Sequence, residues 1–251
     1  MIYRKPFNIY AYNMNFLIKT KLMVFDMAGT TINENGIVYK TLFKTLNQYG
    51  LNVTEKDIEK WHGSNKYEVL EHFLYKSFEN DKKTNQYVNW KLTYRNYEIE
   101  KNTLNKSFEN NLKAEYFDKS NISLIDESMP ELFNYLRSQD IKIALNTGYN
   151  KEIQENIINK LHMNEFIDGY ISSEDVKYGR PYPYMIHKLM EQFEIKNSKE
   201  VIKVGDTVND ILEGKNASCY TIGVLSGADD NNKLNKANYL LDSVMNIYYE
   251  K

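Results

Sequence analysis

The sequence has a single cysteine, Cys219, which is too few thiols for a disulfide framework or a cysteine-rich metal site. It has no excess of positive charge, since 34 Asp and Glu residues outnumber 32 Lys and Arg residues, and this balance argues against nucleic acid and membrane partners. In the first twenty residues, Asn8, Asn13 and Asn15 interrupt each apolar run before it reaches signal-peptide length. We therefore expect a cytoplasmic protein with a small soluble ligand.

Apolar residues are plentiful, at 42% of 251 residues, which is enough for a buried core and an inserted subdomain. Short apolar runs predict buried strands over 21–25, 141–145, 169–171, 201–204, 220–224 and 239–241. Helical patterns lie between them, over 130–138, 151–161, 183–193 and 210–217. Because strands and helices alternate, we expect an α/β fold with a doubly wound parallel sheet, whose ligand lies beyond the carboxyl ends of the strands.

Residues 38–120 interrupt this alternation with helical patterns and no convincing strand. The predicted helices are 38–49, a segment from the N-cap Thr54 to Trp61, 65–78, and one or two helices within 82–112. We expect residues 38–120 to form an inserted α-helical cap domain. The core domain would then consist of 21–37 and 121–251, with 1–20 as an N-terminal extension in which Met14 could be the true start.

Asp26 lies where the first predicted strand gives way to a turn rich in glycine and threonine, and Ala28 follows two residues later. Asp26 could be a nucleophile, although an aspartate at a strand end commonly only caps a turn. Ala28 cannot donate a proton, and the alkoxide leaving group of a phosphate ester needs one. A leaving group stabilised as an enamine on a lysine would not need that acid.

Two further segments place polar groups at predicted strand ends. Thr147 and Gly148 offer a hydroxyl and backbone N–H groups that could bind phosphoryl oxygens, although Thr147 could also be an ordinary turn residue. Asp206 and Asp210 follow Gly205 at a strand-to-helix turn, where two carboxylates suit Mg²⁺, although Asp210 alone would also fit a helix N-cap.

Arg180 stands between two turn residues, Gly179 and Pro181. A guanidinium held there could bind phosphoryl oxygens and neutralise a nucleophile, whereas an isolated arginine would be solvated surface.

In their order along the chain, with Arg180 third and Asp206 and Asp210 fourth, the four segments resemble the four sequence motifs of the haloacid dehalogenase (HAD) superfamily over residues 21–243. The resemblance implies an HAD-like Rossmannoid core in which Asp26 is the nucleophile, Thr147 the second-motif hydroxyl and Arg180 the third-motif cation. It implies Mg²⁺ held by Asp26, the Ala28 carbonyl, Asp206 and, through water, Asp210. The substrate-binding residues that it implies are Gly29, Thr30, Gly148 and Tyr149.

The forms Asp-Met-Ala-Gly-Thr-Thr, Asn-Thr-Gly-Tyr and Gly-Arg-Pro-Tyr-Pro resemble more closely those of the phosphonatase-like hydrolases. That family uses a cap lysine to form a Schiff base with an aldehyde, and the matching position is Lys66. A basic residue there could instead only bind the far end of a substrate. The chain departs from the family pattern at His62, Val69 and Gly36, where the family has methionine, histidine and cysteine.

The resemblance implies a Mg²⁺-dependent hydrolase that forms an aspartyl phosphate and cleaves the C–P bond of phosphonoacetaldehyde or a related small phosphonate. One alternative is a phosphatase of a small phosphate monoester, such as a phosphoglycolate-type substrate, which takes its proton from another group. The other is a non-catalytic binding protein that keeps the fold. A homodimer is one option for the assembly.

Overall fold

The computed structural model describes residues 19–84, 90–119 and 122–249. Its central sheet has six parallel strands in the order β5-β4-β1-β6-β7-β8. The strands are β1 (Leu22–Asp26), β4 (Lys142–Thr147), β5 (Gly169–Ser172), β6 (Val201–Gly205), β7 (Tyr220–Val224) and β8 (Tyr239–Leu241). All six predicted strands are confirmed to within about two residues at each end, and the fold is α/β.

Helices cover both faces of this sheet, so the side chains of β1 are buried on both sides. Leu22 and Val24 pack in a cluster with side chains of α7 (Tyr184–Gln192), whereas Met23 and Phe25 belong to the main core. On the second face, the Phe25 ring lies 4.8 Å from the ring of Phe133 in α5 (Met129–Ser138), centroid to centroid. The other α-helices of the core are α6 (Lys151–Lys160), α8 (Val208–Asn216), α9 (Asn231–Leu234) and α10 (Asn246–Tyr249).

The strand order places β1 between β4 and β6, so the loops after these three strands meet at one edge of the sheet. The predicted helices of the core match α5, α6, α7 and α8 with small shifts at their ends. The sheet therefore brings together segments that lie about 120 and 180 residues after Asp26, as parallel topology requires.

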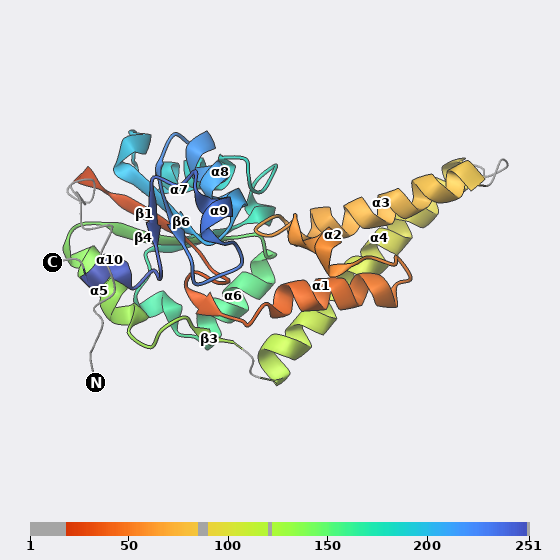
Figure 1. The fold of residues 1–251 in the computed structure, drawn as a ribbon, viewed down its shortest axis with the longest axis horizontal. Coiled ribbons are helices and arrows are strands. Elements are labelled where there is room, and N and C mark those ends of the chain that lie inside the picture. Colours follow the sequence, from red (N-terminus) through yellow and green to blue (C-terminus); the bar gives the residue numbers. More distant parts are fainter. Residues whose placement is uncertain (1–18, 85–89, 120–121, 250–251) are drawn as a thin grey trace.

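A second group of helices, here named the cap, is inserted in the sequence between the first strand and the rest of the core. It consists of α1 (Ile37–Gln48), α2 (Glu55–Glu59), α3 (Lys66–Thr84), α4 (Trp90–Lys113) and the π-helical turn η2 (Ala114–Asp118). In Figure 1 the cap extends away from the sheet, with α3 and α4 as its longest elements. Thr54 is the N-cap of α2, as the sequence predicts, and the structure adds a capping box with Asp57.

Two short strands join the cap to the core. β2 (Ile32–Asn33) leads out of the core and pairs antiparallel with β3 (Ser123–Leu124), which leads back. The sequence patterns did not predict this pair, because two residues are too few to show an alternation. The predicted N-terminal extension falls almost entirely outside the described residues.

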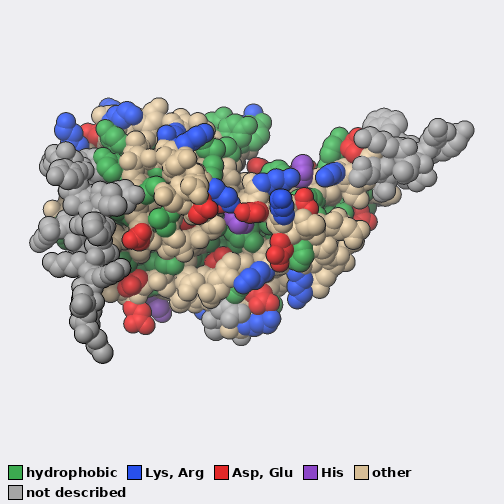
Figure 2. All heavy atoms as spheres, viewed as in Figure 1, with side chains coloured by type: hydrophobic (Ala, Val, Ile, Leu, Met, Phe, Trp, Pro, Cys, Tyr) green, Lys and Arg blue, Asp and Glu red, His purple; other side chains and the backbone are tan. Residues whose placement is uncertain are grey.

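None of the helices in the described ranges combines the length and apolarity needed to cross a bilayer. On the face drawn in Figure 2, basic and acidic side chains are interspersed over core and cap.

Candidate active site

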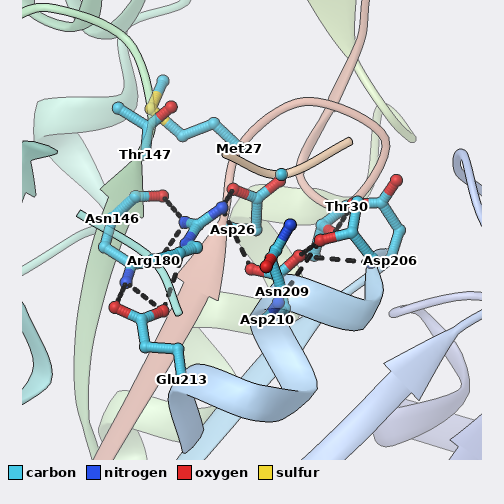
Figure 3. Close-up of polar contacts among 12 residues, drawn as sticks. Asp26, Met27, Thr30, Asn146, Thr147, Arg180, Asp206, Asn209, Asp210 and Glu213 are labelled. Carbon is cyan, nitrogen blue, oxygen red and sulfur yellow. Dashed lines mark hydrogen bonds and ion pairs between the residues drawn. The ribbon is translucent and has the colours of Figure 1, made fainter. Parts of the chain in front are cut away.

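Asp26 ends β1 at the centre of the sheet and is only 5% exposed. Arg180 Nη1 lies 2.6 Å from Asp26 Oδ1 and 3.0 Å from Asp210 Oδ1, so one guanidinium bridges two carboxylates (Figure 3). Burial raises the pKa of Asp26, while the charge of Arg180 acts in the opposite direction. The structure thus places a buried carboxylate and the arginine in direct contact.

Three residues that the sequence analysis missed complete a buried network around Arg180. Lys203 Nζ lies 2.8 Å from Asp210 Oδ1, and Glu213 Oε2 lies 3.1 Å from Arg180 Nε. Asn146 Oδ1 accepts from Arg180 Nη2 at 2.7 Å and from Lys203 Nζ at 2.9 Å. The available signal was Lys203 itself, a charged residue inside an otherwise apolar predicted strand.

Asp206 is held from two sides by the loops that follow β1 and β7. Thr30 Oγ1 donates to Asp206 Oδ1 at 3.1 Å, and the Ala228 N–H donates to Oδ2 at 2.7 Å. A Cβ atom on Gly29 would lie 2.5 Å from Asp206 Oδ2, and one on Gly227 would lie 2.0 Å from it. Both glycines are therefore needed for the backbone to approach this carboxylate.

The three carboxylates that could hold a metal ion lie together at this edge. Asp26, Asp206 and Asp210 each offer an oxygen, and these oxygens all lie within 4.8 Å of one another. Burial raises the pKa of Asp206 well above its ordinary value, and the charges of Asp26 and Asp210 raise it further. A hard divalent cation would relieve this repulsion, so the oxygen-only donor set fits Mg²⁺.

Asp210 makes two sets of structural contacts in addition to lying at this candidate metal site. It forms a capping box with Thr207 at the start of α8, and it pairs with Arg180 and Lys203. Although burial acts to raise the pKa of Asp210, these two cations together lower it. Asp210 is therefore held as a carboxylate at neutral pH.

The segment after β4 lies against the cap. Thr147 is buried, and its Oγ1 accepts from the Tyr149 N–H at 3.3 Å. A Cβ atom on Gly148 would lie 2.7 Å from the Ser64 carbonyl oxygen, so the two segments approach backbone to backbone. The hydroxyl of Tyr149 lies 2.6 Å from the hydroxyl of Tyr116, in the cap.

The loop that precedes α3 docks on the core. Asn209 Nδ2 donates to the His62 carbonyl oxygen at 2.6 Å and to Ser64 Oγ at 3.1 Å. A Cβ atom on Gly63 would lie 2.2 Å from Thr207 Oγ1. The cap loop thus contacts the turn between β6 and α8, which carries Asp206 and Asp210.

Lys66, the first residue of α3, is only 5% exposed. Its Nζ donates to the Ser64 carbonyl oxygen at 2.8 Å and lies 4.9 Å from the centroid of the Tyr39 ring. Within the residues that the structure describes, no carboxylate lies in ion-pairing distance of Lys66. Burial lowers its pKa to about 8, and the charge of Asp26 is the largest influence opposing that change.

A cavity of about 290 Å³ lies at the junction of core and cap. Ala28 and Asp206 line it from the core, and Glu34 and Tyr39 line it from the segment that enters the cap. A second cavity, of about 630 Å³, shares Tyr39 with it and continues along the cap. A small molecule therefore has space between the Asp206 side of the core and Tyr39 of the cap.

Comparison with known proteins gives one family. A family model described as haloacid dehalogenase-like hydrolase matches residues 20–218. The chain is similar to the phosphonoacetaldehyde hydrolase of Bacillus cytotoxicus, with 38% identity over 101 residues, which cover 40% of this chain and 38% of that protein. It is similar to the phosphonoacetaldehyde hydrolase of Bacillus mycoides, with 26% identity over 221 residues, which cover 85% of this chain and 78% of that protein. The match to the first of these relatives thus spans about two fifths of its length.

Solved structures show the same fold at lower identity. A phosphonoacetaldehyde hydrolase-like protein from Oleispira antarctica superposes with a TM-score of 0.71 at 23% identity, over 91% of this chain and 90% of that chain. A β-phosphoglucomutase from Clostridium difficile superposes with a TM-score of 0.72 at 20% identity, over 92% of this chain and 94% of that chain.

Proposed function

Because this chain belongs to the haloacid dehalogenase-like hydrolases, we propose that it is a phosphonatase-like member that hydrolyses the C–P bond of phosphonoacetaldehyde or a related small phosphonate. The observation that carries this proposal is Lys66, a buried amine without an ion-pair partner among the described residues, which follows the cap loop that docks on the turn carrying Asp206 and Asp210. The two Bacillus relatives named phosphonoacetaldehyde hydrolase support the same activity.

In this proposal Asp26 attacks phosphorus and becomes an aspartyl phosphate, which water then cleaves. Arg180, in contact with Asp26, would also bind the transferred group, while the Thr147 hydroxyl and the Gly148 N–H would hold its oxygens. Gly29, Thr30 and Tyr149 remain candidates for substrate contact. In the structure, Thr30 bonds to Asp206 and Tyr149 contacts Tyr116.

The cofactor would be Mg²⁺, held by Asp26, the Ala28 carbonyl and Asp206, with Asp210 acting through a water. When bound, it would offset the repulsion between the carboxylate nucleophile and the phosphonate anion. The supporting observation is the cluster of three buried carboxylates.

Lys66 would form a Schiff base with the aldehyde of the substrate. A lysine amine is nucleophilic only when it is neutral, and an ordinary lysine is almost fully protonated at pH 7. Burial lowers the pKa of Lys66 to about 8, so an appreciable fraction is neutral near that pH. The Schiff base then accepts the electron pair of the C–P bond, so that the bond can break without an acid at Ala28, and the resulting enamine gains its proton afterwards.

The second candidate is a phosphatase of a small phosphate monoester. It needs an acid to protonate an alkoxide, and Glu34 lines the same cavity as Ala28. Under either candidate the substrate is small and phosphorylated or phosphonylated. A reducing compartment such as the cytoplasm suits the one free cysteine, which is buried.

The test is borohydride trapping with phosphonoacetaldehyde. The parent should be inactivated and carry a label on Lys66, while Lys66→Arg should keep the charge, lose roughly 10³-fold or more in turnover and take no label. Lys101→Arg, at a half-buried cap lysine in an ion pair with Glu71, is the matched control and should behave like the parent.

If Lys66→Arg keeps its activity and the parent takes no label, the C–P mechanism is wrong. In that case the phosphatase candidate predicts that Ala28→Asp raises the rate on phosphate esters, by up to about 10²-fold or more if the new acid is well placed.

A further inference from the structure

Glu34 is a buried carboxyl group that has no role in the C–P mechanism described above. It lies just after β2, where the chain leaves the core for the cap, and it is only 5% exposed. It lines the 290 Å³ cavity together with Ala28, the position that lacks an acid. The Glu34 side chain therefore borders the space in which the leaving group of the reaction would lie.

Two hydrogen bonds hold the Glu34 side chain, and both reach the same oxygen. The Val38 N–H donates to Oε2 at 2.7 Å, and the Tyr116 hydroxyl donates to it at 2.9 Å. The Tyr149 hydroxyl lies 2.6 Å from that of Tyr116. In the described part of the chain no hydrogen bond to Oε1 is found, so this oxygen is free to carry a proton.

We propose that Glu34 is the proton donor for the leaving group, in place of the acid that Ala28 lacks, and that Tyr116 and Tyr149 hold it in position. The inference rests on the proposed function for the identity of the substrate. The role itself holds for either candidate substrate, because both leaving groups must gain a proton.

For a phosphonate, the protonated imine (iminium) formed by Lys66 and the aldehyde accepts the electron pair of the C–P bond as phosphorus is transferred to Asp26, which leaves a neutral enamine. The enamine carbon takes the proton of Glu34, so that an iminium re-forms and Glu34 becomes a carboxylate. Water then hydrolyses the iminium, releasing the aldehyde and the lysine amine, and Glu34 regains a proton from solvent. For an ester, the proton goes to the leaving oxygen as it takes the electron pair of the P–O bond.

The surroundings of Glu34 are consistent with a proton donor. Burial raises its pKa, while its two hydrogen bonds and the charges of Lys66 in α3 and Lys40 in α1 act in the opposite direction. Tyr116 from η2 and Tyr149 from the loop after β4 have pKa values well above the ordinary value, so both stay neutral donors. Tyr39, from α1, lines the same cavity and also has a raised pKa.

The test is Glu34→Gln, whose amide oxygen can still accept from Val38 and Tyr116 but whose side chain has no acidic proton. With phosphonoacetaldehyde, turnover should fall by roughly 10²-fold or more while borohydride still labels Lys66. The fall in the parent's rate at high pH that reports a protonated Glu34 should disappear. Glu109→Gln, in which a cap carboxylate likewise accepts from a tyrosine hydroxyl, is the matched control and should keep the parent's rate.

Tyr116→Phe is the second variant and keeps the carboxyl group itself. Because the Tyr116 hydrogen bond lowers the pKa of Glu34, its removal should move the high-pH fall in rate to higher pH, with activity retained below it. An unchanged pH profile in this variant would overturn the proposal, as would Glu34→Gln with a rate within about threefold of the parent.

Loss of the Lys66 label in Glu34→Gln would also overturn it, since Glu34 would then serve only to hold the cap. If the parent itself takes no label, the C–P function fails and the Glu34 role is tested separately on esters. Glu34→Gln should then slow an alkyl phosphate by roughly 10²-fold but leave p-nitrophenyl phosphate, whose leaving group needs no proton, nearly unchanged. An equal loss on both esters would contradict the role.

Discussion

The core side and the cap side of the site bury charged groups in opposite ways. At the core edge, Arg180 and Lys203 each lie within 3.0 Å of a carboxylate oxygen of Asp210, and Arg180 also contacts Asp26. On the cap side, Lys66 is also buried, but its hydrogen bonds go to uncharged groups, the Ser64 carbonyl and the Tyr39 hydroxyl.

The difference shows how pairing decides the state of a buried charge. Burial acts to lower the pKa of Arg180, but its carboxylate neighbours raise it, so the guanidinium stays charged. For Lys66 burial prevails, and the pKa falls to about 8. The paired region suits a group that must hold an anion, and the unpaired one suits a group that must react as a neutral amine.

The largest effect is expected at the core. Asp26→Asn should reduce turnover by roughly 10⁴-fold or more, because the amide is a poor nucleophile of nearly the same shape. Steady-state rates on phosphonoacetaldehyde and on a phosphate ester panel measure this, with circular dichroism to verify the fold. The exposed Asp242→Asn should have the parent's rate. A loss below about tenfold in Asp26→Asn would remove it from the nucleophile role.

Removing a cation from the paired region should destabilise the protein. Lys203→Met leaves Asp210 and Glu213 with less compensating charge in a fully buried place and should cost about 3 to 5 kcal/mol in the free energy of unfolding. Urea denaturation measures it. The control is Lys119→Met, which removes an exposed ion pair with Glu115 and should cost less than about 1 kcal/mol. Equal losses in the free energy of unfolding for the two variants would show that the buried ion pairs of Lys203 stabilise the protein no more than an exposed pair does.

Removing Lys66, the buried cation without a carboxylate partner among the described residues, should change the free energy of unfolding in the opposite direction and by the smallest amount. Lys66→Met should stabilise the fold at pH 7 by about 1 to 3 kcal/mol, because burial no longer opposes a charge. Between pH 8 and 10.5 the unfolded chain binds more protons at Lys66 than the folded one, so the parent's stability should rise with pH in this window.

In Lys66→Met that rise should be absent, which urea denaturation at several pH values would show. If Lys66→Met were destabilising at pH 7, the amine would be held by favourable contacts, and the contrast with the core would be lost.

Much of the core was predictable because its signals are local. An apolar run that ends in a polar turn predicts a buried parallel strand, and β1, β4 and β6 lie where those runs are. Thr54 was recognisable as an N-cap because a capping box depends on residues three apart. The short β2 and β3 escaped prediction because two residues are too few to show an alternation.

The sequence by itself determined the alternation of strands and helices, the strand-end position of Asp26, and the absence of an acid at Ala28. Only the tertiary structure decided that Lys203 is paired, that Lys66 has no carboxylate partner among the described residues and that Glu34 meets Tyr116, 82 residues away. The physical reason is that a residue's tendency to form a strand or a cap depends on its neighbours in the chain. Its burial, charge partners and pKa depend instead on which distant elements pack against it.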